Sequence, residues 1–322
     1  MLDTLERTHP WLAFTLRRAV RLVVSLFAVA SVVFFMIALV PGDPVRAALG
    51  PTAPVSLVDQ RRSALGLDKP LPIQFLDFWQ RLLSGNLGKS IATDRPVAQT
   101  IGERLVTTAT LVGVAIALTL VLALLFGMLI GSLTHNGRRP RTLVAFTVVS
   151  SALNTIPSFL IGIVLVFVFA VTLRALPVAG STGWRSLVLP AFALSIGPAA
   201  GLARIVRAQT DLVLGEDYMT VARGKRLPWR LLYLRHALPN LLTAALTIGG
   251  LLLGVLVAGS VVVESVFARA GLGTAIIQAI IDRDYPLVQG VLLVLAAAVL
   301  LVNVLVDVLL GIVDRQSLIG RS

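Results

Sequence analysis

The sequence contains no cysteine, and its 322 residues include only three histidines, His9, His135 and His236. The absence of cysteine excludes disulfide bonds, thiol catalysis and thiolate metal sites. The histidines lie far apart along the chain and form no metal-ligand motif. Charged residues are also scarce, at 14%, whereas soluble proteins carry about a quarter. The composition therefore argues against a soluble enzyme with a thiol or metal centre.

Hydrophobic residues make up 57% of the chain and are concentrated in long runs. Runs of about 20 apolar residues can cross a bilayer as helices, which indicates an integral membrane protein with several spans. Basic cytoplasmic loops between spans explain the formal net charge of +12. No basic domain stands apart from the membrane-flanking segments, so we expect contact with membrane lipids and none with nucleic acid.

The apolar runs predict an all-α fold with six transmembrane helices, at about 22–40, 108–133, 143–173, 187–206, 241–263 and 287–313. The first run is too long for the apolar core of a signal peptide. The third run contains Pro157 and is longer than one crossing needs, so it should tilt, kink at Pro157 or project beyond the bilayer. The remaining chain divides into an amphipathic N-terminus (1–21), an external segment (41–104), a five-helix region (105–313) and a tail (314–322).

Basic residues set the expected orientation. Six spans place both termini on one side of the membrane. The short loops on that side carry Arg138, Arg139, Arg141 and the basic residues of a block at 216–240. The positive-inside rule gives little weight to the long external segment, so we expect cytoplasmic N and C termini.

Two patterns occur in the external segment. Residues 74–83 place four large apolar side chains at helical spacing: Phe75, Phe78, Trp79 and Leu82. This predicts a short helix at the membrane surface that packs on the spans or receives an external partner. The stretch SGNLGKS at 84–90 looks like a phosphate-binding loop, but Leu83 occupies the position of its first glycine. We therefore expect no nucleotide site in this chain.

A polar, basic block, Glu216–Asn240, separates the fourth and fifth apolar runs. Its basic residues include Arg223, Lys225, Arg226, Arg230 and Arg235. A carboxylate at Glu216 or Asp217 suits the unpaired N–H groups at the start of a short helix. Leu227 precedes Pro228, which disfavours helical geometry, so this helix should end near Lys225. Pro228 then suits the first turn of a second helix, Trp229–Leu238, that leads into the fifth span.

Composition alone leaves two interpretations of this block open. One is a solvated cytoplasmic loop whose arginines are attracted to anionic lipid, by about 1 kcal/mol each. The other is a docking element for a partner protein. A rigid turn between two capped helices is more structure than a passive loop requires.

The residues of the block match a known pattern: Asp217, Tyr218, Ala222, Arg223, Lys225 and Leu227, then Leu234, Arg235, His236, Ala237, Leu238 and Asn240. Further motifs follow along the chain: PGDP at 41–44, LGLDKPLPIQ at 65–74, GNLGKS at 85–90, PSFLIG at 157–162, LPVAG at 176–180, VVVESVFARAGLG at 261–273 and RDYPLVQG at 283–290. The chain resembles inner-membrane permease subunits of ABC importers, in the dipeptide, oligopeptide and nickel family, whose EAA loop corresponds to this block. Arg226 stands where that family has glycine, so we expect Pro228 to form the turn.

The resemblance implies the type I ABC importer permease fold and a transport subunit that is not an enzyme. It implies a second homologous permease in a heterodimer, two cytoplasmic ATPases that bind ATP and magnesium, and an extracytoplasmic solute-binding protein. This chain would bind no cofactor or metal and would lie in the bacterial plasma membrane. The ATPase-coupling residues would be Glu216, Asp217, Tyr218, Ala222, Arg223, Gly224, Lys225, Arg226 and Leu227.

Small and polar residues in the last two spans are candidates for the transport pathway or for close helix packing. The fifth span holds Gly249, Gly250, Gly254, Gly259 and Ser260. The sixth span holds Asn303 and Asp307, which are four residues apart and share a helix face. An intramembrane carboxylate is a functional candidate. Asp307 lies only about 9 Å from the helix end, however, so a structural hydrogen bond or ion pair is the alternative.

The resemblance implies import of dipeptides or oligopeptides, with nickel, haem, glutathione or another small solute as alternatives that the sequence leaves open. A self-sufficient secondary transporter or channel would show inverted repeats or paired intramembrane ionisable residues. A membrane-anchored scaffold would need no ATPase. Several independent motifs in the family's order favour the importer over both.

Overall fold

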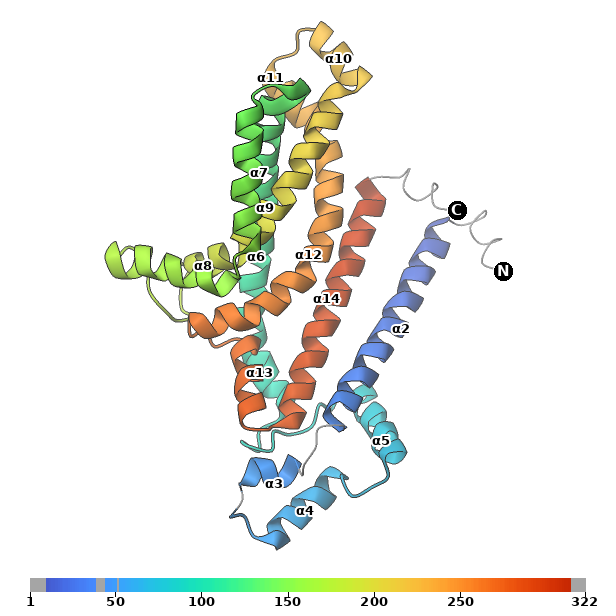
Figure 1. The fold of residues 1–322 in the computed structure, drawn as a ribbon. Coiled ribbons are helices and arrows are strands. Elements are labelled where there is room, and N and C mark those ends of the chain that lie inside the picture. Colours follow the sequence, from blue (N-terminus) through green and yellow to red (C-terminus); the bar gives the residue numbers. More distant parts are fainter. Residues whose placement is uncertain (1–9, 39–43, 51, 314–322) are drawn as a thin grey trace. The chain divides into compact units, whose positions relative to one another are not determined.

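The computed structural model describes residues 10–38, 44–50 and 52–313, which form helices joined by short connections (Figure 1). Within these residues, a single isolated bridge between Lys89 and Pro96 is the only β-type pairing. The predicted all-α fold is confirmed. The first nine residues, the first three residues of the PGDP motif and the predicted tail lie outside the described residues.

Five described helices are long and apolar enough to cross a membrane: α2 (Pro10–Ala38), α6 (Val97–Thr134), α9 (Arg185–Gly215), α12 (Leu238–Val266) and α14 (Tyr285–Val313). They contain five of the six predicted spans. Residues 10–21, which belong to the predicted amphipathic N-terminus, form the first turns of α2. No proline or glycine follows Pro10 within α2, so nothing in the sequence interrupts the helix.

The third predicted span is broken in two. α7 (Pro140–Thr155) and α8 (Ser158–Leu165), with its π-helical continuation η2 (Val166–Thr172), are bent by 98° (Figure 1). The ring of Pro157 excludes helical geometry at Ile156, whose backbone is extended (φ −69°, ψ 124°). The kink expected at Pro157 is present. The bent pair gives a sixth span if its two helices cross together.

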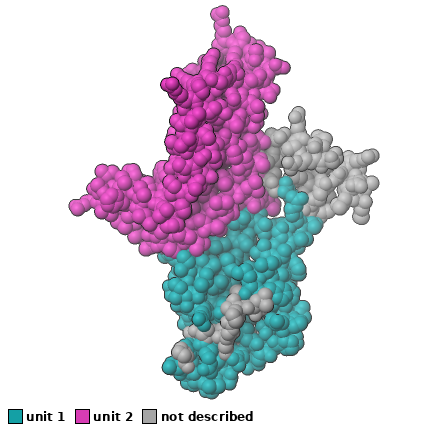
Figure 2. Space-filling view, viewed as in Figure 1, with its two compact units in different colours: residues 1–109, 270–301 teal, residues 110–269, 302–322 magenta. Residues whose placement is uncertain are grey.

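The chain forms two compact units (Figure 2). Unit 1 contains residues 1–109 and 270–301, and unit 2 contains residues 110–269 and 302–322. α6 and α14 contribute residues to both units, so the unit boundaries do not follow the predicted division into an external segment and a five-helix region.

In unit 1 the external segment forms three helices, α3 (Pro44–Leu49), α4 (Val55–Leu65) and α5 (Leu71–Leu83). α5 contains the predicted surface helix and packs against α2 through aromatic rings. Phe34 contacts Phe75 and Phe78, and Phe27 stacks on Trp79 with ring centroids 4.8 Å apart. The predicted packing on a span is therefore found, and burial of these large rings stabilises it.

Two of the sequence motifs meet in a buried polar cluster of unit 1. Asp284, from RDYPLVQG, accepts hydrogen bonds from the hydroxyl of Ser90, from GNLGKS, and from the N–H of Ile91 at 3.1 Å. Asp284 and Ser90 are 2% and 1% exposed. The serine of the apparent phosphate-binding loop is thus bonded to a carboxylate, which would repel a phosphate.

Unit 2 is organised around α9, which packs against α7, α8 and α12. Its buried side chains include members of two apolar clusters that also contain residues of α12. One cluster includes Leu194, Leu256 and Phe267, and the other includes Val206 and Ala245. Both clusters join α9 to α12, so the fourth and fifth predicted spans form one packed pair.

Two glycines on α6 allow it to approach α9 closely within unit 2. A Cβ added at Gly127 would lie 2.6 Å from the Cβ of Val206, and one added at Gly131 would lie 2.6 Å from the Cβ of Thr210. These distances are far below van der Waals contact. The pair has the small-xxx-small spacing that brings membrane helices together.

A buried charged pair fixes the end of α12. Glu264 is fully buried and Arg269 is 3% exposed. Arg269 donates from Nη1 to the carbonyls of Gly180 and Ser186, at 3.3 and 3.1 Å. Burial lowers the pKa of the Arg269 guanidinium, and the charge of Glu264 partly offsets this. The arginine thereby joins the loop that carries LPVAG to the chain that follows α12.

Candidate functional site

The basic block begins where α9 ends. Glu216 has an extended backbone (φ −66°, ψ 149°) and is the N-cap of α10 (Asp217–Gly224). Its carbonyl accepts the N–H of Met219 at 3.0 Å, but its side chain forms no cap hydrogen bond. The predicted short helix is therefore present and ends at Gly224, with Lys225 as its C-cap. The acidic residues at its start can still favour the helix dipole.

One face of α10 is anchored in the core of unit 2. Met219 is fully buried and Ala222 is 5% exposed. Their spacing of three residues places them on the same helix face. They pack with Leu214 and Leu241 in an apolar cluster that joins α10 to α9 and α12.

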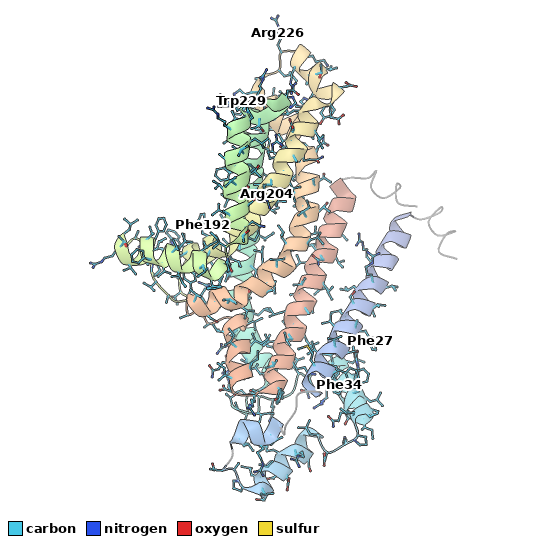
Figure 3. All side chains as sticks on the ribbon, in the orientation of Figure 1. Phe27, Phe34, Phe192, Arg204, Arg226 and Trp229 are labelled. Carbon is cyan, nitrogen blue, oxygen red and sulfur yellow. The ribbon has the colours of Figure 1, made fainter. Side chains whose placement is uncertain are left out.

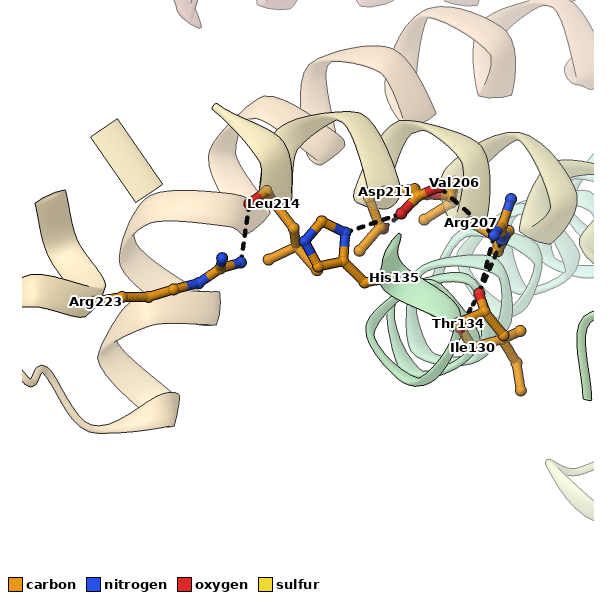
Figure 4. Close-up of polar contacts among 9 residues, drawn as sticks. Ile130, Thr134, His135, Val206, Arg207, Asp211, Leu214 and Arg223 are labelled. Carbon is orange, nitrogen blue, oxygen red and sulfur yellow. Dashed lines mark hydrogen bonds and ion pairs between the residues drawn. The ribbon is translucent and has the colours of Figure 1, made fainter. Parts of the chain in front are cut away.

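Two hydrogen bonds reinforce this anchoring. Arg223 Nη2 donates to the carbonyl of Leu214 at 2.9 Å, where the last carbonyls of α9 favour a cation (Figure 4). Asn240 Nδ2 donates to the hydroxyl of Tyr218 at 2.7 Å. The short helix is thus fastened to both α9 and α12, so a force on α10 would act on both helices.

The opposite face of α10 is exposed. Tyr218 and Val221 are 41% and 58% exposed, and Asp217 is also exposed. Figure 3 shows Arg226 and Trp229 pointing outward at the same end of unit 2. Exposed apolar side chains among charged ones, on a helix outside the predicted spans, are a pattern typical of a protein-docking surface.

The turn after α10 differs from the expected one. Arg226 adopts a left-handed backbone conformation, with φ of 52°, so the arginine takes the geometry for which a glycine is best suited. Pro228 was expected in the first turn of the next helix. Instead it is the N-cap of α11 (Trp229–Leu231), with extended ψ of 146°, and its carbonyl accepts the N–H of Leu232 at 3.1 Å. Both residues therefore shape the turn.

The predicted second helix is continuous with the fifth span. α11 passes through the π-helical segment η3 (Leu232–Ala237) into α12, and the whole stretch runs from Trp229 to Val266. Pro239 lacks an N–H and its ring clashes with the carbonyl four residues earlier, which explains the wider π turns before it.

A polar network beside α10 was missed at the level of sequence. His135 Nδ1 lies 2.9 Å from Asp211 Oδ1, and Arg207 Nη2 lies 3.6 Å from Asp211 Oδ2 (Figure 4). Arg207 also donates to the hydroxyl of Thr134 at 3.0 Å. The network joins the short turn η1 (His135–Gly137) to the last turns of α9. The spacing of four between Arg207 and Asp211 was the signal available in the sequence.

The glycines of the fifth span lie in close helix contacts. A Cβ at Gly249 would meet Leu120 at 3.0 Å, one at Gly250 would meet Val306 at 3.2 Å, and one at Gly259 would meet Leu194 at 2.9 Å. Gly254 is partly buried. These distances are those of helices packed through small residues.

The polar candidates of the last two spans differ in their surroundings. Ser260 is fully buried and donates to the carbonyl of Val257 at 2.7 Å, within its own helix. The Oδ1 atom of Asn303 is buried and accepts no hydrogen bond from the described residues. The side chain of Asp307 lies outside the described part of the chain, so the predicted pairing of Asn303 with Asp307 stays a prediction.

Two family models match the chain. Residues 123–318 match the binding-protein-dependent transport system inner membrane component, and residues 11–112 match the N-terminal part of such membrane components. The chain belongs to this family. It is a multi-pass inner-membrane permease subunit of an ABC importer, of the dipeptide, oligopeptide and nickel type that its motifs resemble.

Similar proteins carry the name glutathione transport system permease protein GsiC. The permease is 38% identical to that of Pectobacterium atrosepticum over 306 residues, which is 94% of this chain and 98% of the relative. It is 35% identical to that of Escherichia coli strain K12 over 305 residues, with the same coverage of both chains. Among solved structures, the MetNI methionine ABC transporter aligns with a TM-score of 0.56 at 19% identity, over 67% of this chain and 97% of that chain. This likeness supports the importer permease fold.

Proposed function

We propose that this permease imports short peptides and that glutathione is among them. The motif pattern favours peptides as the solute class. The relatives are named for the transport of glutathione, which is itself a tripeptide. Glutathione is therefore the first solute to test, ahead of dipeptides, nickel and haem.

We further propose that α10 is the coupling helix. The nine coupling residues lie on it and at its ends: Glu216, Asp217, Tyr218, Ala222, Arg223, Gly224, Lys225, Arg226 and Leu227. Its partners are two cytoplasmic ATPases, which bind ATP and magnesium, while this chain binds neither. A second homologous permease forms a heterodimer with this chain, and the two chains together enclose the pathway. An extracytoplasmic solute-binding protein delivers solute to the external segment and to the stretch 264–286. Both termini of the chain are cytoplasmic.

A single observation carries the coupling proposal: α10 is buried on one face and exposed on the other. Met219 anchors it, Val221 and Tyr218 are presented outward, and hydrogen bonds fasten it to α9 and α12. ATPase closure would push the exposed face. Because the helix is fastened to two spans, that push would tilt them as rigid bodies and switch the pathway between inward and outward access.

The absence of cysteine allows a direct contact test. Val221→Cys introduces the chain's only thiol, which can carry a photo-crosslinker in the complex purified with its co-expressed partners. We expect a crosslink to the ATPase subunit. Leu83→Cys is the matched control, since Leu83 is 82% exposed on the external segment and should give none. The proposal would be contradicted if no ATPase copurified with the permease, or if both positions gave equal crosslinking.

Substitutions on the two faces of α10 should have opposite signatures. Val221→Asp alters the exposed face, so we expect thermal stability within about 0.5 kcal/mol of wild type but a roughly tenfold loss of solute-stimulated ATP hydrolysis, because it places a charge in a docking contact. Met219→Ala removes a buried side chain and should cost about 2–5 kcal/mol of stability. Thermal unfolding and ATPase assays in proteoliposomes separate the two. Normal coupling in Val221→Asp would contradict the role of α10.

Solute identity is tested by uptake into proteoliposomes that contain the whole complex and its binding protein. We expect ATP-dependent uptake of labelled glutathione and of short peptides, and no uptake of nickel. Uptake of nickel alone would overturn the peptide assignment. Uptake without ATP would indicate a secondary transporter.

A further inference from the structure

Arg204 is a positively charged side chain within the fourth predicted span. It lies between apolar neighbours on α9, and Figure 3 shows it part-way along the column formed by α7 and α9. Its partner Ser151 is eight residues beyond Leu143, where the apolar run of α7 begins, and thus about 12 Å along that helix. Along α9 itself, Arg204 is two residues, about 3 Å, before the end of the predicted span. A charged side chain inside a span is costly to bury and is a functional candidate by default.

The charge of Arg204 is not compensated by a described carboxylate. Its Nη1 donates to the hydroxyl of Ser151 at 2.6 Å, which uses one of its five N–H groups. Arg207, one turn further along α9, is different because it pairs with Asp211 at 3.6 Å and donates to Thr134. One arginine is therefore part of a closed network, while the other retains N–H groups for an anion.

Further polar residues share the face of α7 that carries Ser151. Thr147, Ser151, Asn154 and Thr155 recur at helical spacing on one face of α7. Asn154 is exposed, and its side chain forms no hydrogen bond with a described residue. Gly201, one turn before Arg204, lies beneath it: a Cβ there would be 2.7 Å from Asn154 Oδ1. The glycine thus lets α7 and α9 come close at Asn154, one turn along α7 from Ser151.

A polar face of this kind is unstable against lipid tails, because unpaired donors have no partner in hydrocarbon. It is stable against water or an anionic ligand. A guanidinium binds carboxylates with two parallel hydrogen bonds, and an amide N–H can donate to the same group.

We propose that Arg204, with Ser151 and Asn154, borders the solute pathway and binds a carboxylate of the transported solute. The inference rests on the proposed function, because it needs a solute that carries carboxylates, as peptides do. It assigns charge selection to the permease itself, in addition to any selection by the binding protein.

The first test measures access and charge at this face and does not depend on transport. In the assembled complex, Asn154→Cys should react faster with an anionic methanethiosulfonate reagent than with a cationic one. The ratio should fall about tenfold with Arg204→Gln, which removes the charge, and persist with Arg204→Lys. Val149→Cys is the matched control, since Val149 is 57% exposed on another face of α7 and should not react. The proposal is overturned if Asn154→Cys does not react, or if the ratio of the two rates stays the same after Arg204→Gln.

The second test measures selectivity with glutathione and its diethyl ester, whose carboxylates are blocked. Arg204→Gln should lower uptake of glutathione roughly tenfold and leave uptake of the ester unchanged. An equal loss for both solutes would indicate a structural role and overturn the proposal. If the wild-type complex imports neither compound, the proposed function fails. Normal glutathione uptake by Arg204→Gln refutes only this inference.

Discussion

Arg226 forms the turn after α10 with a strained backbone conformation. Its φ of 52° lies in the left-handed region, which is unfavourable for a side chain with a Cβ. Gly224, two residues earlier, has an ordinary backbone conformation, and a Cβ there would meet nothing within 4 Å. The residue that needs glycine is therefore an arginine, and the glycine lies where it is not needed.

This predicts the effect of exchanging the two residue types. Arg226→Gly should raise stability by up to about 1 kcal/mol, since relief of backbone strain outweighs the added freedom of the unfolded chain. Gly224→Ala should leave stability unchanged or slightly higher, because alanine favours the helix. Thermal unfolding of the purified complex measures both. A loss of stability in Arg226→Gly would mean that the arginine side chain makes a stabilising contact with a partner.

Among the elements, the α6–α9 pair depends most directly on small side chains. Gly127 and Gly131 face Val206 and Thr210 at distances that leave no room for a methyl group. A Cβ at Gly127 would also lie 2.9 Å from the carbonyl of Ala203, which cannot rotate away. The helix contact therefore requires glycine for steric reasons.

We expect Gly127→Ala to destabilise the permease by about 1–3 kcal/mol, because the helices must separate to accept the methyl group. Gly113→Ala is the matched control. It lies on the same helix and in unit 2, with nothing within 4 Å of its added Cβ, and should not destabilise. The melting temperature and the yield of assembled complex are the measurements. Equal behaviour of the two variants would show that α6 and α9 are not packed this closely in the membrane.

Sequence periodicity located the elements of this chain well but not their breaks. The amphipathic pattern of α5 and the span pattern of α12 follow from local side-chain order, so both were predictable. The 98° bend at Pro157 was one of three expectations, and the π-helical segments η2 and η3 were not expected. Bends and π turns depend on whether neighbouring helices can pack against the displaced backbone. The spacing of apolar and polar residues along one helix carries no information about that packing.

The whole chain is predicted to have both termini in the cytoplasm. Leu83→Cys on the external segment should react with a membrane-impermeant maleimide in intact cells. Arg138→Cys, exposed just beyond η1, should react only after permeabilisation. Because the chain has no native cysteine, each signal comes from one position. Labelling of Arg138→Cys in intact cells would reverse the orientation.

The membrane class, the all-α fold, the importer family and the location of α10 could all be inferred from the order of the residues. Each of these depends on local order: apolar runs, helical spacing, Pro228 and motifs in succession. Only the tertiary structure shows which face of α10 is buried, that Ser90 meets Asp284, and that Arg204 lies against Ser151 with no carboxylate among the described residues beside it. These contacts join residues that are far apart in the chain, and only packing brings such groups within hydrogen-bonding distance.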